Sequence, residues 1–372
     1  MVHNLPPGGA RRVLLEHARH LEDELVEFCL TTASPVTDAP HRVSYEPAAP
    51  KLASVLRPAL RYTDLARLLR AWRRLTQQVR DQPRFDVVLA HPCQFLQAPP
   101  ALAWLAPPGV YFCHEPRRVD YEPAARRTRS ARTRHVYAPL YRAERSSDRA
   151  AVRAAARIVT NSDFTARRIH DAYGRDATPL PLGVPEGFRA ASSPVAPRHL
   201  LSVGALLPTK GHDLVVEAAA RAHRRWPVTI VAPRPDRAEE QRLRALAQAR
   251  GVVLDVRIAI TDDELRDAYR QAAATLYLAR EEPYGLASLE AQSCGAPVIV
   301  AAEGGLPETI VADVTGWAVP RDPAAAAAKI DLLDDARRRE QMAERAAEHG
   351  GRLSWRASAV AMHAVLEEAA AR

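Results

Sequence analysis

Residues 281–308 read EEPYGLASLEAQSCGAPVIVAAEGGLPE, and this stretch organises the second half of the chain. The apolar run 275–278 before it is typical of a buried strand, and a helix is predicted to begin close to Gly285 or Leu286. Gly295 suits the left-handed position that follows a helix, and an apolar run comes next. The stretch therefore predicts a strand, a loop, a helix and a second, parallel strand, which is the repeating unit of an α/β sheet.

Two carboxylates of this stretch occupy positions with a chemical use. Glu282 lies in the loop before the helix, and Glu290 lies about one turn inside it. A helix N-terminus attracts a diphosphate through its unpaired N–H groups and partial positive charge, and Gly285 lets a ligand approach the backbone closely. A carboxylate accepts hydrogen bonds from a ribose diol or from a pair of sugar hydroxyls. The pattern indicates a site for a compound that carries both groups.

Outward from this stretch, short apolar strands alternate with amphipathic helices, a pattern typical of a parallel sheet with crossover helices. The strands expected in the first half are 25–31, 41–45, 86–90, 109–113 and 157–160, with helices at 10–20 and 64–80. Those expected in the second half are 200–203, 228–232, 252–256, 275–278 and 297–301. Two successive α/β runs of similar length predict two doubly wound, Rossmann-like domains that face a central cleft.

The linker between the two domains is expected in residues 186–199, which lack periodicity and are rich in proline. The predicted division is 1–190 for the first domain, 191–353 for the second and 354–372 for a last helix. Only four residues precede the first proline- and glycine-containing loop, whereas a Rossmann-like domain normally opens with a buried strand. Either the first strand is very short, or the protein begins upstream of Met1.

Composition predicts a soluble, cytoplasmic protein. A chain of 372 residues, 47% hydrophobic and 26% charged, is globular and long enough for two cores. No apolar run reaches the roughly 18 residues of a membrane span, and Met1 is followed by a polar stretch rather than the apolar core of a signal peptide. Four dispersed cysteines without C-x-x-C spacing favour buried thiols over disulfides or zinc ligands.

The net charge of +8 is unevenly distributed. Between Arg117 and Arg149, ten arginines stand against four acidic residues, which raises the hypothesis of peripheral contact with an anionic membrane surface or an anionic acceptor. The alternative is a set of solvated helix faces in an arginine-biased chain. The apolar stripe of helix 64–80 favours core packing over membrane docking, and no motif indicates nucleic-acid recognition. Lysine occurs only three times, so Lys210 inside a motif is informative.

Taken residue by residue, the 281–308 stretch resembles the signature of family 4 glycosyltransferases, which are retaining enzymes of the GT-B fold. That signature has two glutamates separated by seven residues, with an aromatic-Gly-Leu after the first. Here these are Glu282, then Tyr284-Gly285-Leu286, then Glu290, followed by Cys294-Gly295-Ala296-Pro297. Two surface glutamates can share this spacing by chance, but the whole string matches.

A second match, SVGALLPTKG from Ser202 to Gly211, is similar to the family's strand-loop-helix in which an arginine and a lysine neutralise the leaving diphosphate. Lys210 occupies the lysine position, whereas Ala205 stands where the family has the arginine. This departure leaves the phosphate site one charge short and puts the turnover rate in question. Arg234, in a loop where the family often has Gly-x-Gly, is the first candidate to supply the charge.

The first half of the chain carries weaker matches. Gly8-Gly9 before a helix resembles the family's glycine-rich loop near the donor phosphates, which makes Gly9 a candidate donor-binding residue. His114 resembles the family's histidine facing the donor sugar, and its alternative is a structural histidine. Asn161-Ser162-Asp163 is similar to a loop lining the cleft, with helix N-capping as an equal alternative. The helix that ends at Arg372 resembles the C-terminal helix that returns to the first domain.

The resemblance implies a metal-independent retaining glycosyltransferase that moves a sugar from a UDP-, GDP- or similar donor to a hydroxyl group. Lys210 and the helix start at Gly285-Leu286 would stabilise the leaving diphosphate. Glu282 would orient the donor sugar and Glu290 the ribose, while His114 would contact the sugar or the incoming hydroxyl. The chain has no Asp-x-Asp, so no metal is expected, and the nucleotide sugar is a co-substrate rather than a bound cofactor. The sequence leaves the acceptor open between a lipid, a natural product and a glycan.

Other interpretations stay open at this point. A glycoside hydrolase would use Glu282 and Glu290 as its carboxylate pair, which a retaining hydrolase holds about 5–5.5 Å apart. A GT-B pseudoenzyme or a nucleotide-sugar epimerase is compatible with the loss of the motif arginine at Ala205. A basic surface-binding protein would explain the arginines but not the Glu282–Glu290 string.

Overall fold

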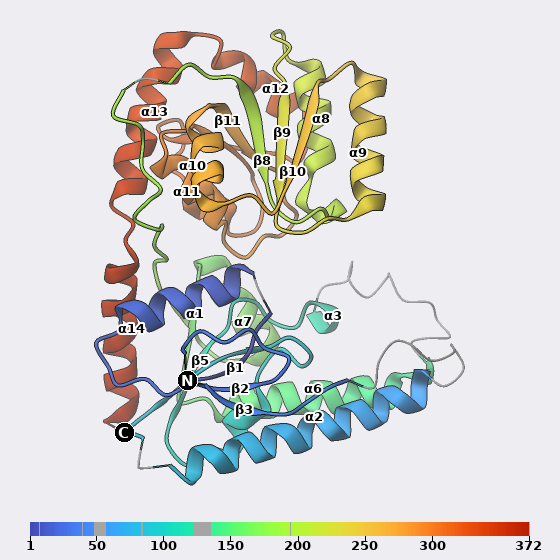
Figure 1. Ribbon diagram of the computed structural model, residues 1–372, viewed down its shortest axis with the longest axis vertical. Helices are drawn as coiled ribbons and strands as arrows, with labels where there is room; N and C mark the ends of the chain where they lie inside the picture. Colours follow the sequence, from blue (N-terminus) through green and yellow to red (C-terminus); the bar gives the residue numbers. More distant parts are fainter. Residues whose placement is uncertain are drawn as a thin grey trace. The chain divides into compact units, whose positions relative to one another are not determined.

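The computed structural model describes residues 1–6, 8–38, 40–47, 57–82, 85–121, 135–193 and 195–371. The chain divides into two units: Met1–Pro181 with Trp355–Arg372 form unit 1, and Leu182–Ser354 form unit 2. The residues 186–199, expected as a linker, belong to unit 2. Each unit is built around its own parallel sheet (Figure 1).

The described residues of unit 1 form a seven-stranded parallel sheet in the order β3-β2-β1-β4-β5-β6-β7. Its strands are β1 Val2–Asn4, β2 Phe28–Leu30, β3 His41–Val43, β4 Val88–Cys93, β5 Gly109–Phe112, β6 Arg157–Thr160 and β7 Thr178–Pro179. β1 is only three residues long, yet it is fully buried and pairs with both β2 and β4. The opening strand that a Rossmann-like domain requires is therefore present and very short.

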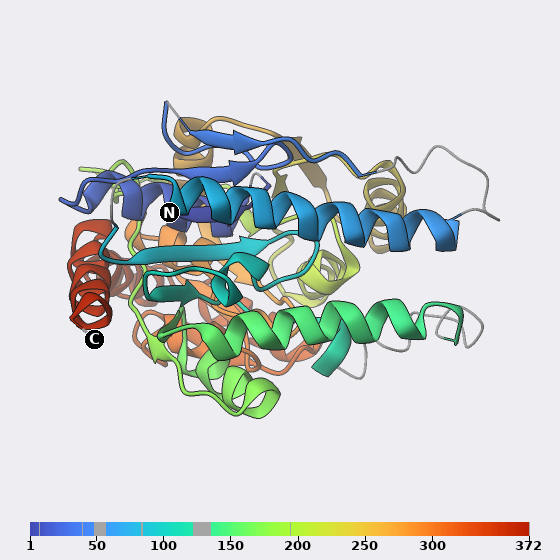
Figure 2. The same cartoon turned by 90° about the horizontal axis from the view of Figure 1, so that it is seen from below.

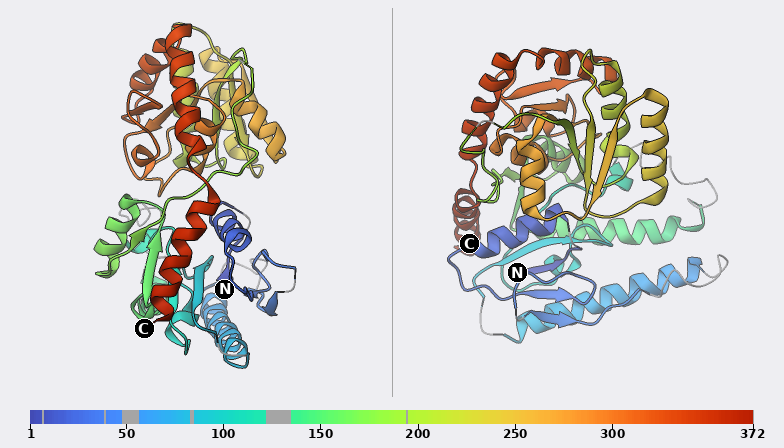
Figure 3. Two further views of the ribbon diagram at one scale, coloured as in Figure 1. Left: turned by 90° about the vertical axis from the view of Figure 1, so that its left-hand side faces the viewer. Right: turned by 45° about the horizontal axis from the view of Figure 1, so that its top comes forward.

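Helices cover both faces of this sheet. The helices of unit 1 are α1 Gly9–His20, α2 Arg57–Arg80, α3 Arg118–Tyr121, α6 Ala138–Ala154, α7 Asp163–Tyr173 and α14 Trp355–Ala370, with the 3-10 turn η1 Pro100–Ala103. Trp72 and Leu75 of α2 share a core with Val152 of α6 and Tyr111 of β5, so α2 and α6 cover the same face (Figure 2). The apolar stripe of α2 is thus core packing, as expected from its spacing. α1 and α14 lie side by side (left view of Figure 3).

The described residues of unit 2 form a six-stranded parallel sheet in the order β10-β9-β8-β11-β12-β13. Its strands are β8 His199–Val203, β9 Val228–Ala232, β10 Leu254–Ile258, β11 Ala272–Tyr277, β12 Val298–Ala301 and β13 Gly316–Val319. The first strand of the unit lies at the centre, so the strand order reverses between β8 and β11. In doubly wound sheets, ligands bind beyond the carboxyl ends of the strands at this switch point.

The helices of unit 2 pack on both sides of its sheet (Figure 1). They are α8 His212–Arg221, α9 Arg237–Arg250, α10 Asp262–Arg270, α11 Leu286–Ser293, α12 Pro323–Leu332 and α13 Ala336–Gly351, with the 3-10 turns η2 Pro208–Lys210 and η3 Leu306–Thr309. α8 packs against α9 and α12, while α11 packs against α10 and α13. No helix in the described part of the chain is long and apolar enough to cross a membrane.

Candidate active site

The loops that follow β8 and β11 carry the residues predicted to bind the donor. β8 and β11 are neighbouring strands, so both loops leave the sheet at its carboxyl edge beside the switch point. The backbone N–H of Arg280 donates a 2.7 Å hydrogen bond to the carbonyl oxygen of Thr209, which joins the two loops. Lys210 and Glu282, 72 positions apart in the sequence, meet here.

Lys210 and Glu282 form an ion pair. Lys210 Nζ lies 2.7 Å from Glu282 Oε2, and the two side chains are 21% and 17% exposed. Lys210 Nζ also donates a 3.5 Å hydrogen bond to the hydroxyl of Tyr277 and lies 5.7 Å from the centre of its ring. Partial burial makes this pair stronger than an ion pair in bulk solvent, while both charged groups still reach water. A cation and a carboxylate are thus held side by side at the switch point.

The N-terminus of α11 lies directly after Glu282. Gly285 caps the helix with a φ of 130°, and a Cβ at this position would lie 2.6 Å from Leu306 Cδ2. Within the described residues, no side chain caps α11, and the backbone N–H of Ser288 donates a 2.9 Å hydrogen bond to the carbonyl oxygen of Gly285. The N–H groups of Leu286 and Ala287 are therefore the ones positioned to bind an anion. Leu286 is the first residue of the helix. The predicted loop, glycine and helix start are therefore all at the expected places.

The loop after β12 holds the backbone of Glu282. Gly305 N–H donates a 2.7 Å hydrogen bond to the carbonyl oxygen of Glu282. Gly304 has a φ of 71°, and a Cβ there would lie 2.5 Å from the same carbonyl oxygen. This close approach explains the glycine at position 304.

Glu290, in the second turn of α11, is buried and hydrogen-bonded to a second helix. Its carboxylate is 5% exposed and accepts a 3.1 Å hydrogen bond at Oε2 from the hydroxyl of Tyr269 in α10. Burial, together with the Glu290 carboxylate, raises the pKa of Tyr269 well above its ordinary value. Sequence reasoning did not single out Tyr269, because its link to Glu290 depends on the packing of α10 against α11.

The loop at Ala205 is held by a histidine rather than by an arginine. His212 is buried, and its Nε2 donates a 3.1 Å hydrogen bond to the carbonyl oxygen of Ala205. Its Nδ1 accepts from the hydroxyl of Ser202 at 2.9 Å. Burial lowers the pKa of His212, which favours this neutral form. Arg234 is exposed in the loop after β9, and its part in phosphate binding stays a prediction.

His114 in unit 1 belongs to a histidine pair. Its Nε2 lies 3.4 Å from Nδ1 of His91 in β4, and the ring of Phe112 lies 4.5 Å and 5.2 Å from the two imidazole centres. Burial lowers the pKa of His114 to about 3, with His17 adding to the effect, and burial also lowers the pKa of His91 well below its ordinary value. Both rings are neutral at pH 7, so His114 can exchange hydrogen bonds but does not offer a full positive charge.

The other predicted residues of unit 1 lie at helix starts. Gly9 is the first residue of α1, and both Gly9 and its neighbour Gly8 are exposed. Ser162 caps α7 by accepting a 3.0 Å hydrogen bond from the backbone N–H of Thr165, so its capping role is confirmed. Asn161 Nδ2 donates a 3.3 Å hydrogen bond to the carbonyl oxygen of His114.

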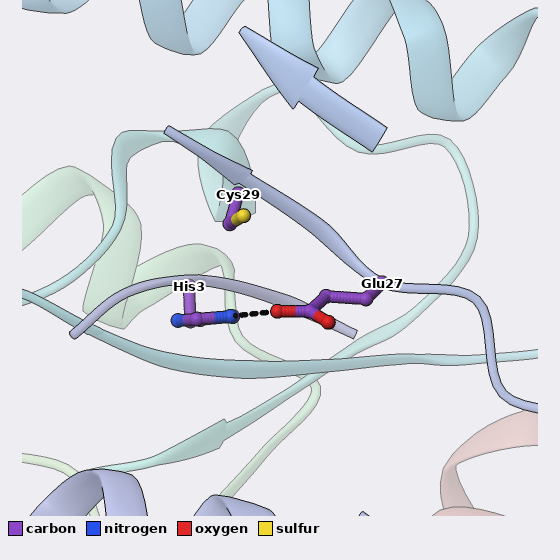
Figure 4. Close-up of side chains that lie close together, drawn as sticks. All are labelled: His3, Glu27 and Cys29. Atoms are coloured by element: carbon purple, nitrogen blue, oxygen red, sulfur yellow. Dashed lines mark hydrogen bonds and ion pairs between the residues drawn. The ribbon is translucent and has the colours of Figure 1, made fainter. Parts of the chain in front are cut away.

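One cluster of metal-ligand type occurs among the described residues, formed by His3, Glu27 and Cys29 (Figure 4). His3 Nδ1 accepts from the backbone N–H of Leu5 at 3.3 Å, so the proton of the neutral ring lies on Nε2, which donates to Glu27 at 2.7 Å. Glu27 also accepts hydrogen bonds from the backbone and hydroxyl of Thr37. These bonds occupy the atoms that a metal would need, so the cluster reads as a buried hydrogen-bond network. All four cysteines of the chain are free and buried.

Comparison with known families covers both units. Residues 7–186 match the family described as Glycosyltransferase Family 4, and residues 185–349 match the family described as Glycosyl transferases group 1. Together the two matches span residues 7–349, which include all of α1 and most of α13.

Curated relatives of the chain include D-inositol 3-phosphate glycosyltransferases. A D-inositol 3-phosphate glycosyltransferase of Acidothermus cellulolyticus is 36% identical over 230 residues, which cover 55% of this chain and 51% of that protein. One from Salinispora tropica is 29% identical, covering 94% of this chain and 78% of that protein. The chain spans about half the length of the first of these relatives.

Solved structures show the same fold at lower identity. Sucrose-phosphate synthase from Thermosynechococcus elongatus aligns with a TM-score of 0.72 and 19% identity, over 97% of this chain and 93% of that one. HepE from Anabaena, in complex with UDP and glucose, aligns with a TM-score of 0.71 and 17% identity, over 98% of each chain. The two Rossmann-like units are those of the GT-B fold.

Proposed function

This chain belongs to the group 1 and family 4 glycosyltransferases, and from this premise we propose that it moves a sugar from a nucleotide-sugar donor to a hydroxyl acceptor, with retention and without a metal. The observation that carries the proposal is the Lys210–Glu282 pair at the N-terminus of α11. It brings a cation, a set of helix N–H groups and a carboxylate to the switch point of unit 2. A nucleotide sugar offers a diphosphate and hydroxyl groups for these partners.

In the proposed reaction, the bond between the anomeric carbon and the diphosphate oxygen breaks. The acceptor oxygen bonds to the anomeric carbon on the face from which the diphosphate leaves, and the acceptor proton passes to the departing diphosphate. Lys210 and the α11 N–H groups stabilise the negative charge that develops on the leaving group. Glu282 orients the donor sugar, Glu290 holds the ribose, and His114 is a predicted contact of the sugar or the incoming hydroxyl.

We also propose which donor nucleotide and which acceptor to test first. HepE, which shares the fold, binds UDP, so UDP is the first nucleotide to test, with GDP and ADP beside it. The relatives named above act on D-inositol 3-phosphate, so this compound is the first acceptor to test, ahead of lipid, natural-product and glycan acceptors. Lys210 and the helix N-terminus supply positive charge without a metal, and transfer is therefore expected to continue in excess chelator.

The first experiment tests Glu290. Binding of UDP, GDP and ADP is measured by titration calorimetry for the parent and for Glu290→Gln. If Glu290 accepts hydrogen bonds from the ribose, the glutamine of the variant keeps one acceptor oxygen but loses the charge and the second acceptor. The loss of one charge-assisted bond, worth about 1.5–3 kcal/mol, should weaken binding of the tightest nucleotide at least tenfold. Glu240→Gln, on an exposed face of α9, is the control and should bind as the parent does.

Three results would count against the proposal. Equal nucleotide affinity in Glu290→Gln and the parent would remove Glu290 from the ribose. Loss of transfer in chelator, restored by magnesium or manganese, would contradict the metal-free mechanism. Nucleotide binding without any transfer, even with a broad set of acceptors, would favour the pseudoenzyme that the alanine at position 205 suggests.

A further inference from the structure

Tyr269 connects the helix α10 to the predicted ribose-binding residue of α11. Its hydroxyl donates the 3.1 Å hydrogen bond to Glu290 Oε2, and it is 0% exposed. A hydrogen bond to a carboxylate in so enclosed a place is stronger than the same bond at the surface, because water does not compete for either partner. The direction of the Glu290 carboxylate therefore depends on a residue that lies in another helix.

The core of unit 2 fixes the ring of Tyr269. Phe188 meets it at a centre-to-centre distance of 6.1 Å and an interplanar angle of 65°. Both rings share a hydrophobic core with Leu201 of β8 and Leu289 of α11. In a closely packed core, a ring of this size has one position, so the O–H group is aimed at α11 before any nucleotide binds. A tyrosine hydroxyl is protonated at neutral pH, so that of Tyr269 is a donor.

We propose that Tyr269 is a positioning residue for nucleotide binding: it holds the Glu290 carboxylate in the orientation that accepts the ribose diol. The inference rests on the proposed function, because it requires a ribose at Glu290. A glutamate side chain has three rotatable torsions, and ordering them on binding costs entropy. The hydrogen bond from Tyr269 orders this side chain in advance, so that less freedom is lost when the ribose arrives.

The effect of Tyr269 is specific to ligands that carry ribose hydroxyls. The nucleotide used in the test is the tightest binder of UDP, GDP and ADP, together with its 2′,3′-dideoxy form. The parent is expected to prefer the ribose form at least tenfold. Tyr269→Phe keeps the ring and removes only the hydroxyl, so it should weaken the ribose form about tenfold and leave the dideoxy form unchanged. A merely structural role would weaken both forms alike.

Two further variants complete the design. Tyr111→Phe removes a hydroxyl that is equally buried but belongs to unit 1, and it should keep the parental preference. In the double variant Tyr269→Phe/Glu290→Gln, the loss should equal that of Glu290→Gln alone, because the tyrosine acts only through the glutamate.

The results that would overturn the role of Tyr269 differ from the result that would overturn the proposed function. The proposal is overturned if Tyr269→Phe keeps the full preference for the ribose form, if both forms weaken equally, or if the two substitutions are additive. Failure of Tyr269→Phe to fold also counts against it, since a positioning role predicts that binding alone suffers. If the parent binds none of the three nucleotides, the proposed function fails instead.

Discussion

Lys210 Nζ lies 2.7 Å from Glu282 Oε2, so a diphosphate that binds this lysine has to share the cation with a carboxylate. The proposed roles then give an unusual expectation for Glu282→Gln. Without its charge, residue 282 competes less for the lysine, and the bare nucleoside diphosphate should bind about two- to fivefold more tightly, as expected if the pair contributes about 0.2–1 kcal/mol. Sugar transfer should fall at the same time, because the donor sugar loses its partner. Calorimetry and a transfer assay on one protein preparation measure both effects.

The matched control is Glu303→Gln. It removes one charge from the same sheet edge, where Glu303 Oε1 lies 3.7 Å from Nε of Arg321 and accepts from the backbone N–H of Glu281. If the control tightens nucleotide binding as much as Glu282→Gln does, the effect is one of overall charge. Weaker nucleotide binding in Glu282→Gln would mean that the glutamate supports Lys210 instead of competing with it.

At this scale the sequence could predict residues but not their partners. Glu282, Gly285 and Glu290 stand in one string, and the way a helix starts after a loop places them without knowledge of the rest of the fold. Tyr269 and His212 act through groups that only the packed sheet brings near them. No local pattern distinguishes such residues from ordinary core side chains.

The helices α1 and α14 meet at a histidine with an unusual environment. His17 Nε2 lies 2.9 Å from the Ser358 hydroxyl, and the His17 ring lies 5.9 Å from that of Trp355. Burial lowers the pKa of His17 to about 4. The unfolded chain, with a pKa near 6.5, binds this proton more readily, so the free energy of unfolding falls as the pH drops from about 6.5 to about 4. The contribution of His17 to this loss is roughly 3 kcal/mol.

The measurement is urea unfolding at a series of pH values between 7 and 4.5. His17→Gln has no proton to gain in this range, so its stability curve should be flatter than that of the parent. The exposed His135, replaced by glutamine, is the control and should reproduce the parental slope. A parental slope in His17→Gln would show that His17 is not a source of the acid sensitivity.

Helices and strands with a clear hydrophobic pattern could be predicted from the sequence, whereas the short strands β7 and β13 could not. β9 has the bounds expected from its apolar run, because five buried residues leave little choice of register. β7 has two exposed residues, one of them a proline, and β13 is a four-residue run with a glycine at its start. Their strand conformation depends on hydrogen bonding to the neighbouring strands, β6 for β7 and β12 for β13. Local propensity alone is too weak to specify such edge strands.

The repeated α/β pattern of the sequence predicts the two sheets. It does not predict which charged side chains lie on the surface, and the structure shows this for the described residues. Residues 122–134 of the Arg117–Arg149 segment lie outside the described residues. Within unit 1, α2 carries exposed arginines at Arg61, Arg67, Arg70, Arg73, Arg74 and Arg80. The acidic residues of the neighbouring α6 are buried: Glu144 pairs with Arg117, and Asp148 accepts a 2.8 Å hydrogen bond from Tyr173. The acidic residues of α6 therefore do not offset the exposed arginines of α2, although the exposed Glu46 lines the same hollow as Arg67, Arg70 and Arg74.

This charge predicts salt-dependent binding to anionic vesicles. Replacing Arg67, Arg70 and Arg74 together by glutamine should weaken co-sedimentation with phosphatidylserine-containing vesicles at least tenfold at low salt, since each basic residue near such a surface contributes about 1 kcal/mol. The same replacement of Arg337, Arg338 and Arg345, exposed on α13, is the control. Binding that is absent at low salt, or equal in both triple variants, would assign the arginines to solvation alone.

The division of the chain has a consequence for its biosynthesis. Unit 2 is one uninterrupted stretch, whereas unit 1 needs Trp355–Arg372 to complete it. The buried side chains of Met362 and Leu366 in α14 are translated after the whole of unit 2. A ribosome therefore makes the first 181 residues early, but these residues wait for their final helix while the whole of unit 2 is synthesised. Unit 1 therefore acquires its α14 helix only after the whole of unit 2 has been synthesised.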